Sequence, residues 1–128
     1  MNLCDMNEIK ALLARHGFHF SKSMGQNFLI QDWVPRDIAA ASGAGPGVGV
    51  LEIGPGIGPL TRELSLLADR VTAVELDEPL LPILDETLAD RDNVTVIPGD
   101  IMRFDLDRVV DGEFPGLTPI VCANLPYN

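Results

Sequence analysis

The sequence predicts an α/β fold with a doubly wound, parallel sheet, and two patterns support this prediction. After residue 47, short β-branched runs alternate with segments of helical periodicity, and alternate glycines follow the first run. Strands that alternate with helices pair in parallel through right-handed crossovers. The expected strands are Val48 to Ile53, Arg70 to Leu76, Val94 to Ile97 and Ile120 to Ala123, and the expected helices between them are Leu60 to Ala68 and Leu80 to Ala89.

A first helix is expected near the N-terminus, before these strands. The segment Met6 to His16 carries Ile9, Leu12 and Leu13 at helical spacing. Gly17 follows directly and is typical of a helix end. The segment should therefore bury one apolar face against the rest of the molecule.

A loop and a second helix are expected next. The segment Phe18 to Leu29 has no sustained periodicity and predicts a loop. Asp32 is a candidate N-cap for a helix in which Val34, Ile38 and Ala41 share one face.

Length and composition predict one globular unit. The chain has 128 residues, of which 46% are hydrophobic, enough to bury a single core. Charged residues interrupt every apolar run before it could span a membrane, and the first residues lack the pattern of a signal peptide. We therefore expect a soluble, cytoplasmic protein without a membrane partner.

The charge distribution is uneven. The net charge of −10 argues against this chain binding nucleic acid by itself, because affinity for phosphate needs clustered basic residues. However, no acidic residue occurs from Ile9 to Gln31, whereas Lys10, Arg15 and Lys22 do. This basic segment is either a solvated helix and loop or a surface that faces a polyanion.

The two cysteines do not predict a metal site. Cys4 and Cys122 lie far apart, without the cysteine or histidine spacing of a zinc site. Cys122 stands in an apolar run and is expected to be a buried free thiol.

The glycines after the first strand predict a ligand-binding turn. Gly54, Gly56 and Gly58 are spaced G-x-G-x-G between a strand and a helix. Such a turn lets the backbone approach a ligand closely, and the helix behind it offers free N–H groups. The spacing differs from the dinucleotide fingerprint G-x-G-x-x-G, which disfavours NAD-dependent oxidoreduction. The alternative is a tight turn with a purely structural role.

Acidic residues follow the next two strands. Glu75 and Asp77 end the second strand at the position where an acid meets ribose hydroxyls in doubly wound nucleotide sites. Alternation along a strand puts both on one side and does not choose between them. Asp100 follows the third strand and can accept a hydrogen bond from an exocyclic amine. Together the three strand ends predict one nucleotide site.

These motifs resemble those of a known family. Glu52 to Gly58, Glu75, Gly99-Asp100 and Asn124 to Tyr127 are similar to motifs of S-adenosylmethionine-dependent adenine methyltransferases. With the upstream segment Gly25 to Leu29, they resemble the KsgA group, which dimethylates two adenosines near the end of small-subunit ribosomal RNA. The resemblance spans residues 22–128 and implies a Rossmann-like methyltransferase sheet.

The resemblance implies contacts with S-adenosylmethionine. Gly54 and Gly56 would lie under its methionine part, and Glu75 would hold its ribose. Asp100 would bind the adenine amine, with Ile101 packed on the adenine ring. The remaining implied cofactor contacts are Asn27, Leu29, Leu76 and Asn124.

The motif Asn124-Leu125-Pro126-Tyr127 suits methyl transfer to an adenine amine. This amine is a poor nucleophile, so catalysis needs acceptors for its N–H groups. The Asn124 side chain and the Leu125 carbonyl can accept them, while Pro126 fixes the turn and Tyr127 offers a ring for stacking. The sulfonium donor needs chiefly proximity and alignment, so no metal is expected.

The resemblance also bears on organisation and partners. Family members continue for roughly as long again, so the chain resembles a truncated form. We expect helices and a cofactor-covering loop in residues 1–47, the N-terminal half of the methyltransferase domain in 48–128, and neither the C-terminal half nor a helical RNA-binding domain. The implied partner is small-subunit ribosomal RNA or its precursor particle, contacted by Lys10, Arg15 and Lys22.

The family sheet would contribute strands in the order 3-2-1-4, leaving Ile120 to Ala123 at an exposed edge. A chain with such an edge would be weakly stable or would self-associate. Two alternatives remain: a large-subunit RNA methyltransferase of the Erm kind, and a module that binds cofactor without catalysis.

Overall fold

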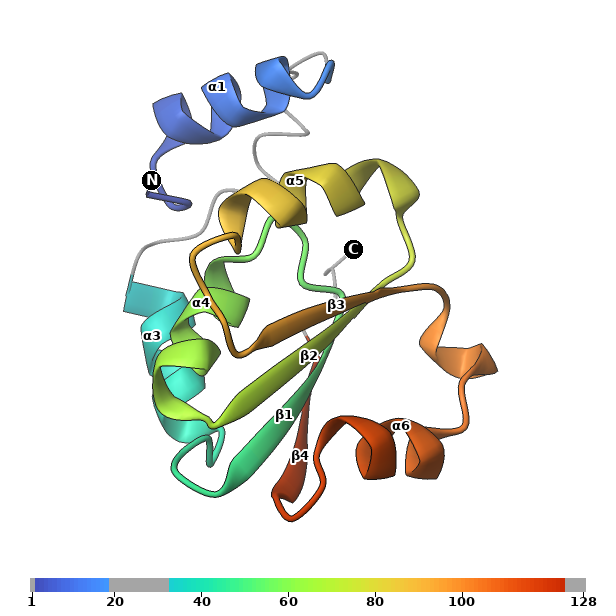
Figure 1. Ribbon diagram of the computed structural model, residues 1–128. Helices are drawn as coiled ribbons and strands as arrows, with labels where there is room; N and C mark the ends of the chain where they lie inside the picture. Colours follow the sequence, from blue (N-terminus) through green and yellow to red (C-terminus); the bar gives the residue numbers. More distant parts are fainter. Residues whose placement is uncertain (1, 19–32, 124–128) are drawn as a thin grey trace.

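The computed structural model describes residues 2–18 and 33–123, which form a four-stranded parallel sheet with helices around it (Figure 1). This confirms the predicted α/β class. The α-helices are α1 (Met6–Arg15), α3 (Trp33–Ala41), α4 (Pro59–Leu67), α5 (Leu81–Thr87) and α6 (Leu106–Glu113). The strands are β1 (Val48–Ile53), β2 (Arg70–Glu75), β3 (Val94–Pro98) and β4 (Thr118–Ala123), and 3-10 turns cover Glu78–Leu80 and Ile101–Arg103.

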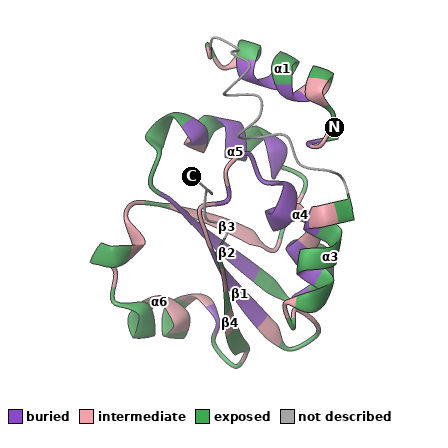
Figure 2. Ribbon diagram, turned by 180° about the vertical axis from the view of Figure 1, so that it is seen from behind, coloured by how far each residue is buried: buried purple, intermediate pink, exposed green. Residues whose placement is uncertain are grey.

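The strand order is β3-β2-β1-β4, as predicted. β1 is paired on both sides, with Leu51 opposite Thr72 of β2 and Val121 of β4. β4 lies at the edge of this described sheet, and Val121 is 58% exposed. The central strands therefore carry the buried core, which Figure 2 shows as the buried colour along β1 and β2.

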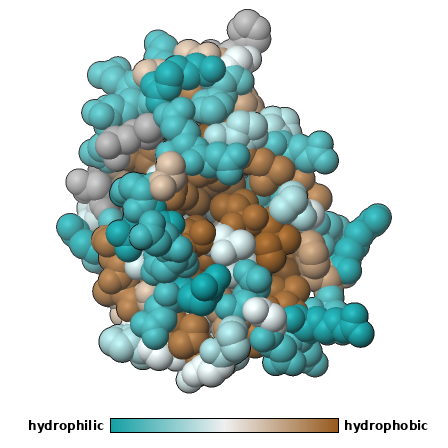
Figure 3. Space-filling view, in the orientation of Figure 1, coloured by the Kyte–Doolittle hydropathy of each residue, from teal (hydrophilic) through white to brown (hydrophobic). Residues whose placement is uncertain are grey.

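Side chains alternate between the two faces of the sheet. Val50 and Val71 point to the face covered by α3 and α4, where they pack with Leu60 and Leu64. Leu51 and Val74 belong to the cluster on the other face, together with Phe114 and residues of α6. Figure 3 shows apolar side chains gathered over the sheet between α5 and α6. The parallel strands are thus apolar on both faces, as doubly wound sheets require.

Helix α1 lies over α5, away from the strands of the sheet (Figure 1). Asp5 caps it by accepting a hydrogen bond from the Asn7 N–H at 2.9 Å. Its buried residues Ile9, Leu12 and Leu13 form a cluster with Ile57, Leu80 and Ile83. The predicted apolar face is confirmed, and it contacts the glycine turn through Ile57.

Helix α3 confirms the second helix that the sequence predicts. Ile38 is 45% exposed and Ala41 is exposed, whereas Pro35 and Ala39 are the buried residues. Ala39 packs in the cluster that contains Leu60 and Leu64 of α4. Small side chains allow two helices to approach closely, so packing selected them over the larger isoleucine. The proposed cap, Asp32, lies outside the described residues.

Helix α6 was not expected from the sequence. Asp105 caps it by accepting a hydrogen bond from the Asp107 N–H at 3.1 Å. Val109 and Val110 pack on the sheet, but none of the helix residues is fully buried. Gly112 and the acidic residues of this short helix disfavour a helical interpretation of the sequence, although Leu106, Val109 and Val110 recur at helical spacing.

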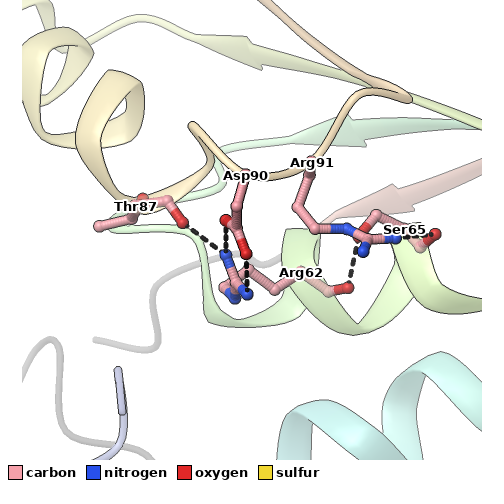
Figure 4. Close-up of polar contacts among 5 residues, drawn as sticks. All are labelled: Arg62, Ser65, Thr87, Asp90 and Arg91. Carbon is pink, nitrogen blue, oxygen red and sulfur yellow. Dashed lines mark hydrogen bonds and ion pairs between the residues drawn. The ribbon is translucent and has the colours of Figure 1, made fainter. Parts of the chain in front are cut away.

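Arg62 of α4 joins this helix to the segment after α5 (Figure 4). Its guanidinium donates to the Thr87 carbonyl at 2.8 Å and to both carboxylate oxygens of Asp90, at 2.5 and 2.9 Å. Nearby, Arg91 donates to the Ser65 hydroxyl at 2.8 Å and to its carbonyl at 3.0 Å. The last turn of α4 is therefore tied to the segment that leads into β3.

The Arg62–Asp90 pair predicts an acid-sensitive stability. The hydrogen bond from Arg62 lowers the pKa of Asp90 from its ordinary value of 3.8 to about 2. Because the pKa of Asp90 is lower in the folded state, the Arg62–Asp90 pair stabilises the fold above the ordinary pKa of 3.8. This stabilisation is lost as the pH falls through about 2. Asp90→Asn should therefore flatten the loss of Tm between pH 4 and pH 2, as measured by circular dichroism. The exposed neighbour Asp92 provides the control, and an equal flattening by Asp92→Asn would contradict the assignment.

No helix in residues 2–18 or 33–123 has the length and apolar character needed to cross a bilayer.

Candidate functional site

The glycine turn has the backbone conformation that its sequence predicts. Gly54, Gly56 and Gly58 have φ values of 73°, 64° and 100°, in the region that side chains disfavour. A Cβ atom on Gly58 would also lie 3.1 Å from the Thr87 hydroxyl. Gly58 begins α4 without a side-chain cap, so N–H groups at the start of this helix remain available. The turn can therefore place backbone donors against a ligand.

Glu75 lies directly against this turn. Its carboxylate accepts a hydrogen bond from the Gly56 N–H at 3.3 Å and another from the Asp77 N–H at 2.9 Å. Glu75 is 6% exposed, whereas Asp77 is exposed to solvent. Of the two acids between which alternation does not choose, Glu75 is therefore the one that is hydrogen-bonded to the glycine turn. Each carboxylate oxygen can accept a further hydrogen bond, so Glu75 can still hold a pair of hydroxyl groups.

The end of β3 adds Asp100 to the same edge of the sheet. The Gly99 N–H donates to the Glu75 carbonyl at 2.9 Å, which fixes the end of β3 beside the end of β2. Asp100 caps the turn that begins at Ile101, with one carboxylate oxygen accepting from the Met102 N–H at 2.9 Å. Ile101 is half-buried against the core cluster of the α6 face. The three predicted strand ends thus meet at one edge.

Leu76 follows Glu75 at this edge and is 66% exposed. The described residues give no structural reason for so large an exposed fraction of an apolar side chain at the end of a buried strand. Leu76 and Ile101 leave β2 and β3, which are adjacent strands. Two apolar side chains from neighbouring strand ends suit a flat aromatic ring.

Glu52 is a candidate functional residue that the sequence reasoning missed. It is fully buried in β1, and one of its oxygens accepts a hydrogen bond from the Thr61 hydroxyl of α4. Its other oxygen, Oε2, is buried without a hydrogen-bond partner among the described residues. The signal was available in the sequence, because a glutamate interrupts an apolar strand immediately before the glycine turn.

The environment of Glu52 favours its protonated form. Burial raises the pKa of Glu52 from 4.5 to about 7; the hydrogen bond from Thr61 acts in the opposite direction, and the negative charge of Glu75 adds to the rise. Because the pKa of Glu52 is higher in the folded state, protonated Glu52 contributes fully to the stability of the fold below its unfolded-state pKa of 4.5. This contribution is lost as the pH rises through about 7. The site therefore holds a proton that can be released near neutral pH.

Some of the remaining candidate site residues lie within the described part of the chain, and others lie outside it. Arg15 forms an ion pair with Glu86 of α5, with half of its side chain exposed, and His16 lies 3.0 Å from the same carboxylate. Lys10 lies on α1 as well, so these two basic residues share one helix. Lys22, Asn27, Leu29 and the motif Asn124 to Tyr127 lie outside the described residues.

Cys122 is a free thiol, as expected, but it is half-buried and not fully buried. Burial, followed by the negative charge of Glu52, raises its pKa and keeps the thiol protonated. Within residues 2–18 and 33–123, no group of three potential ligand side chains could hold a metal ion.

Comparisons with known proteins agree on one family. The family model described as ribosomal RNA adenine dimethylase matches residues 17–128. A protein of Streptococcus thermophilus named ribosomal RNA small subunit methyltransferase A is 48% identical over 128 residues, which cover 99% of this chain and 44% of that protein. A protein of the same name from Geobacillus thermodenitrificans is 49% identical over 119 residues, 92% of this chain and 41% of that protein.

Solved structures show the same relationship. The 23S rRNA methyltransferase ErmE has a TM-score of 0.59 and 30% identity, covering 77% of this chain and 48% of that one. A dimethyladenosine transferase from Plasmodium falciparum also has a TM-score of 0.59, with 26% identity over 76% of this chain and 33% of that one. The chain spans less than half the length of the curated relatives it matches. It belongs to the ribosomal RNA adenine dimethylase family.

Proposed function

We propose that this chain is the cofactor-binding part of a cytoplasmic enzyme that uses S-adenosylmethionine to dimethylate adenosines in small-subunit ribosomal RNA. The observation that carries the proposal is the meeting of the glycine turn, Glu75 and Asp100 at one edge of the sheet. Ligands of open α/β sheets bind at this edge. The names of the relatives at 48 and 49% identity support the choice of RNA.

The described residues fit such a cofactor. Gly54 and Gly56 carry no side chains on the turn against which the methionine part would lie, and the Glu75 carboxylate suits the two ribose hydroxyls. Asp100 has one carboxylate oxygen engaged by Met102, and its other oxygen suits the adenine amine. Leu76 and Ile101 supply apolar surface for the adenine ring. We assign Asn27 and Leu29 to the same site from their sequence motif alone.

We assign catalysis to Asn124, Leu125, Pro126 and Tyr127, which directly follow β4 in the sequence. The cofactor supplies a methyl group on a positively charged sulfur. Asn124 and the Leu125 carbonyl accept the N–H groups of the target amine, Pro126 fixes their geometry, and Tyr127 stacks on the base. The target base must leave any helix to reach them.

We also propose the division of the chain and its RNA-facing surface. Residues 1–47 form the N-terminal helices and a loop over the cofactor, and residues 48–128 form half of the methyltransferase domain. The basic residues Lys10, Arg15 and Lys22 face the RNA, since the acidic body of the chain repels a polyanion. Arg15 can exchange its Glu86 partner for a phosphate because its side chain is half exposed.

Methyl transfer assays test this proposal in the native protein. Immature small subunits should accept two methyl groups on each of two adenosines, while naked large-subunit RNA should accept none. The reverse preference would favour the Erm kind, to which the structural likeness to ErmE points. Calorimetry with S-adenosylmethionine that detects binding without any methyl transfer would favour a non-catalytic module.

The edge strand β4 supports a further expectation for this chain as a separate polypeptide. Its outer side pairs with no described strand, and exposed edges pair readily with other chains. We therefore expect self-association, and light scattering should detect species heavier than the monomer of 13.8 kDa. A monomer that melts cooperatively would contradict this expectation.

A further inference from the structure

A buried carboxyl group with one unpartnered oxygen lies immediately behind the candidate cofactor site. Glu52 is 0% exposed, and its Oε2 atom has no hydrogen-bond partner among the described residues. Thr61 of α4 holds the other oxygen and so fixes the orientation of the carboxyl group. A buried, unpartnered carboxyl oxygen is costly, and it calls for a functional explanation.

Glu52 lies close to the glycine turn and to Glu75, which form the candidate cofactor site. Glu52 is two residues before Gly54, so their Cα atoms lie within about 7 Å of each other. Glu52 pairs with Ala73 in the sheet register, which puts Glu75 two residues further along the neighbouring strand on the same face. A positive charge held at the glycine turn would therefore lie close to both carboxyl groups.

The surroundings of Glu52 contain no described basic partner that would keep it ionised. The titratable groups that act on it from neighbouring strands are Glu75 on β2 and Cys122 on β4, and α4 contributes only the neutral Thr61 hydroxyl. Burial, and to a lesser degree the negative charge of Glu75, raise the pKa of Glu52 to about 7, so below this pH the carboxyl group keeps its proton until a cation enters the site.

We propose that Glu52 is a positioning residue that releases its proton to solvent when a cationic cofactor binds at the glycine turn. This inference rests on the proposed function. S-adenosylmethionine carries a net positive charge on its sulfur, whereas the demethylated product does not. Ionised Glu52 then attracts the cofactor more strongly than the product, so the charge lost in methyl transfer loosens the product's binding.

The size of the effect follows from electrostatics. Two unit charges about 8 Å apart at an effective dielectric constant of about 20 change a binding constant by roughly 30-fold. The affinity for S-adenosylmethionine should therefore rise by about 30-fold between pH 5 and pH 8. The affinity for S-adenosylhomocysteine should change several times less over the same range, because the product lacks the sulfonium charge.

Calorimetry of the native protein in two buffers with different ionisation enthalpies tests the proposal. Near pH 6.5, binding of S-adenosylmethionine should release roughly half a proton or more, and binding of S-adenosylhomocysteine should release almost none. Glu52→Gln should abolish the difference. Asp111→Asn removes one exposed charge from α6, on the other face of the sheet, and should leave the release unchanged.

The outcomes separate the two proposals. Equal proton release with both ligands, or undiminished release by a folded Glu52→Gln variant, would overturn the role of Glu52 and leave the cofactor assignment intact. If Glu52→Gln does not fold, the comparison of the two ligands in the wild-type protein decides alone. Failure of both ligands to bind at any pH would overturn the proposed function and this inference with it.

Discussion

Replacing Glu75 with glutamine is expected to weaken binding of S-adenosylmethionine by about 30- to 100-fold, since hydrogen bonds to a charged group contribute roughly 2–3 kcal/mol. Glu75 lies against the Gly56 N–H and is almost fully buried, so its charge is poorly screened by solvent. Glutamine keeps the shape of the side chain but removes the charge and one acceptor. Isothermal titration calorimetry on the native protein measures the change.

Asp77 provides the matched control for this prediction. It is an acid two residues away that the sequence could not distinguish from Glu75, but its side chain is exposed. Asp77→Asn should change the affinity by less than about threefold, because solvent screens exposed charges. A larger loss with Asp77→Asn than with Glu75→Gln would transfer the ribose contact to Asp77 and refute the present assignment.

Gly49→Ala is expected to destabilise the chain by about 3 kcal/mol and to lower its Tm by roughly 10 °C. A Cβ atom on Gly49 would lie 2.3 Å from Cδ1 and 2.4 Å from Cγ of the Phe114 ring. Phe114 is 2% exposed in the core beneath β1, so the ring has no free volume into which to move. Thermal unfolding followed by circular dichroism measures the loss.

Gly112→Ala serves as the control, because a Cβ atom on Gly112 meets no heavy atom within 4 Å. Gly112 lies inside α6, where alanine is favoured over glycine by up to about 1 kcal/mol, so this change should be neutral or stabilising. In a Phe114→Leu background, Gly49→Ala should cost less than in the wild type. Equal costs in the two backgrounds would show that Phe114 is not the cause.

The sheet could be predicted from the sequence because each strand carries its own signal. β1 was predicted with its observed bounds, and the other three strands differ at their ends by two residues or fewer. β-branched runs between glycine or proline residues are local signals, and the crossover rule then determines the parallel pairing. The order β3-β2-β1-β4 came from the family resemblance, since no local pattern specifies which strand lies beside β1.

What the sequence could not predict depends on tertiary contacts. The sequence pattern of α3 groups Val34, Ile38 and Ala41 on one face, but only the packing on α4 shows that Ala39 is buried and Ile38 is exposed. Glu75 and Asp77 were equivalent by alternation, and only the path of the backbone after β2 turns one of them away from the glycine turn. Glu52 belongs to a sequence motif, but only the folded arrangement of Thr61 and Cys122 around it shows that its Oε2 atom has no hydrogen-bond partner among the described residues.

The packing of Ile57 affects how the molecule responds to a ligand at the glycine turn. This residue sits in the glycine turn, yet its side chain belongs to the cluster formed by Ile9, Leu12 and Leu13 of α1. Ordering of the turn therefore slows amide exchange and protease cleavage in a helix more than forty residues earlier in the chain. Conversely, deleting α1 should remove the apolar residues that pack against Ile57 and so make the glycine turn less rigid.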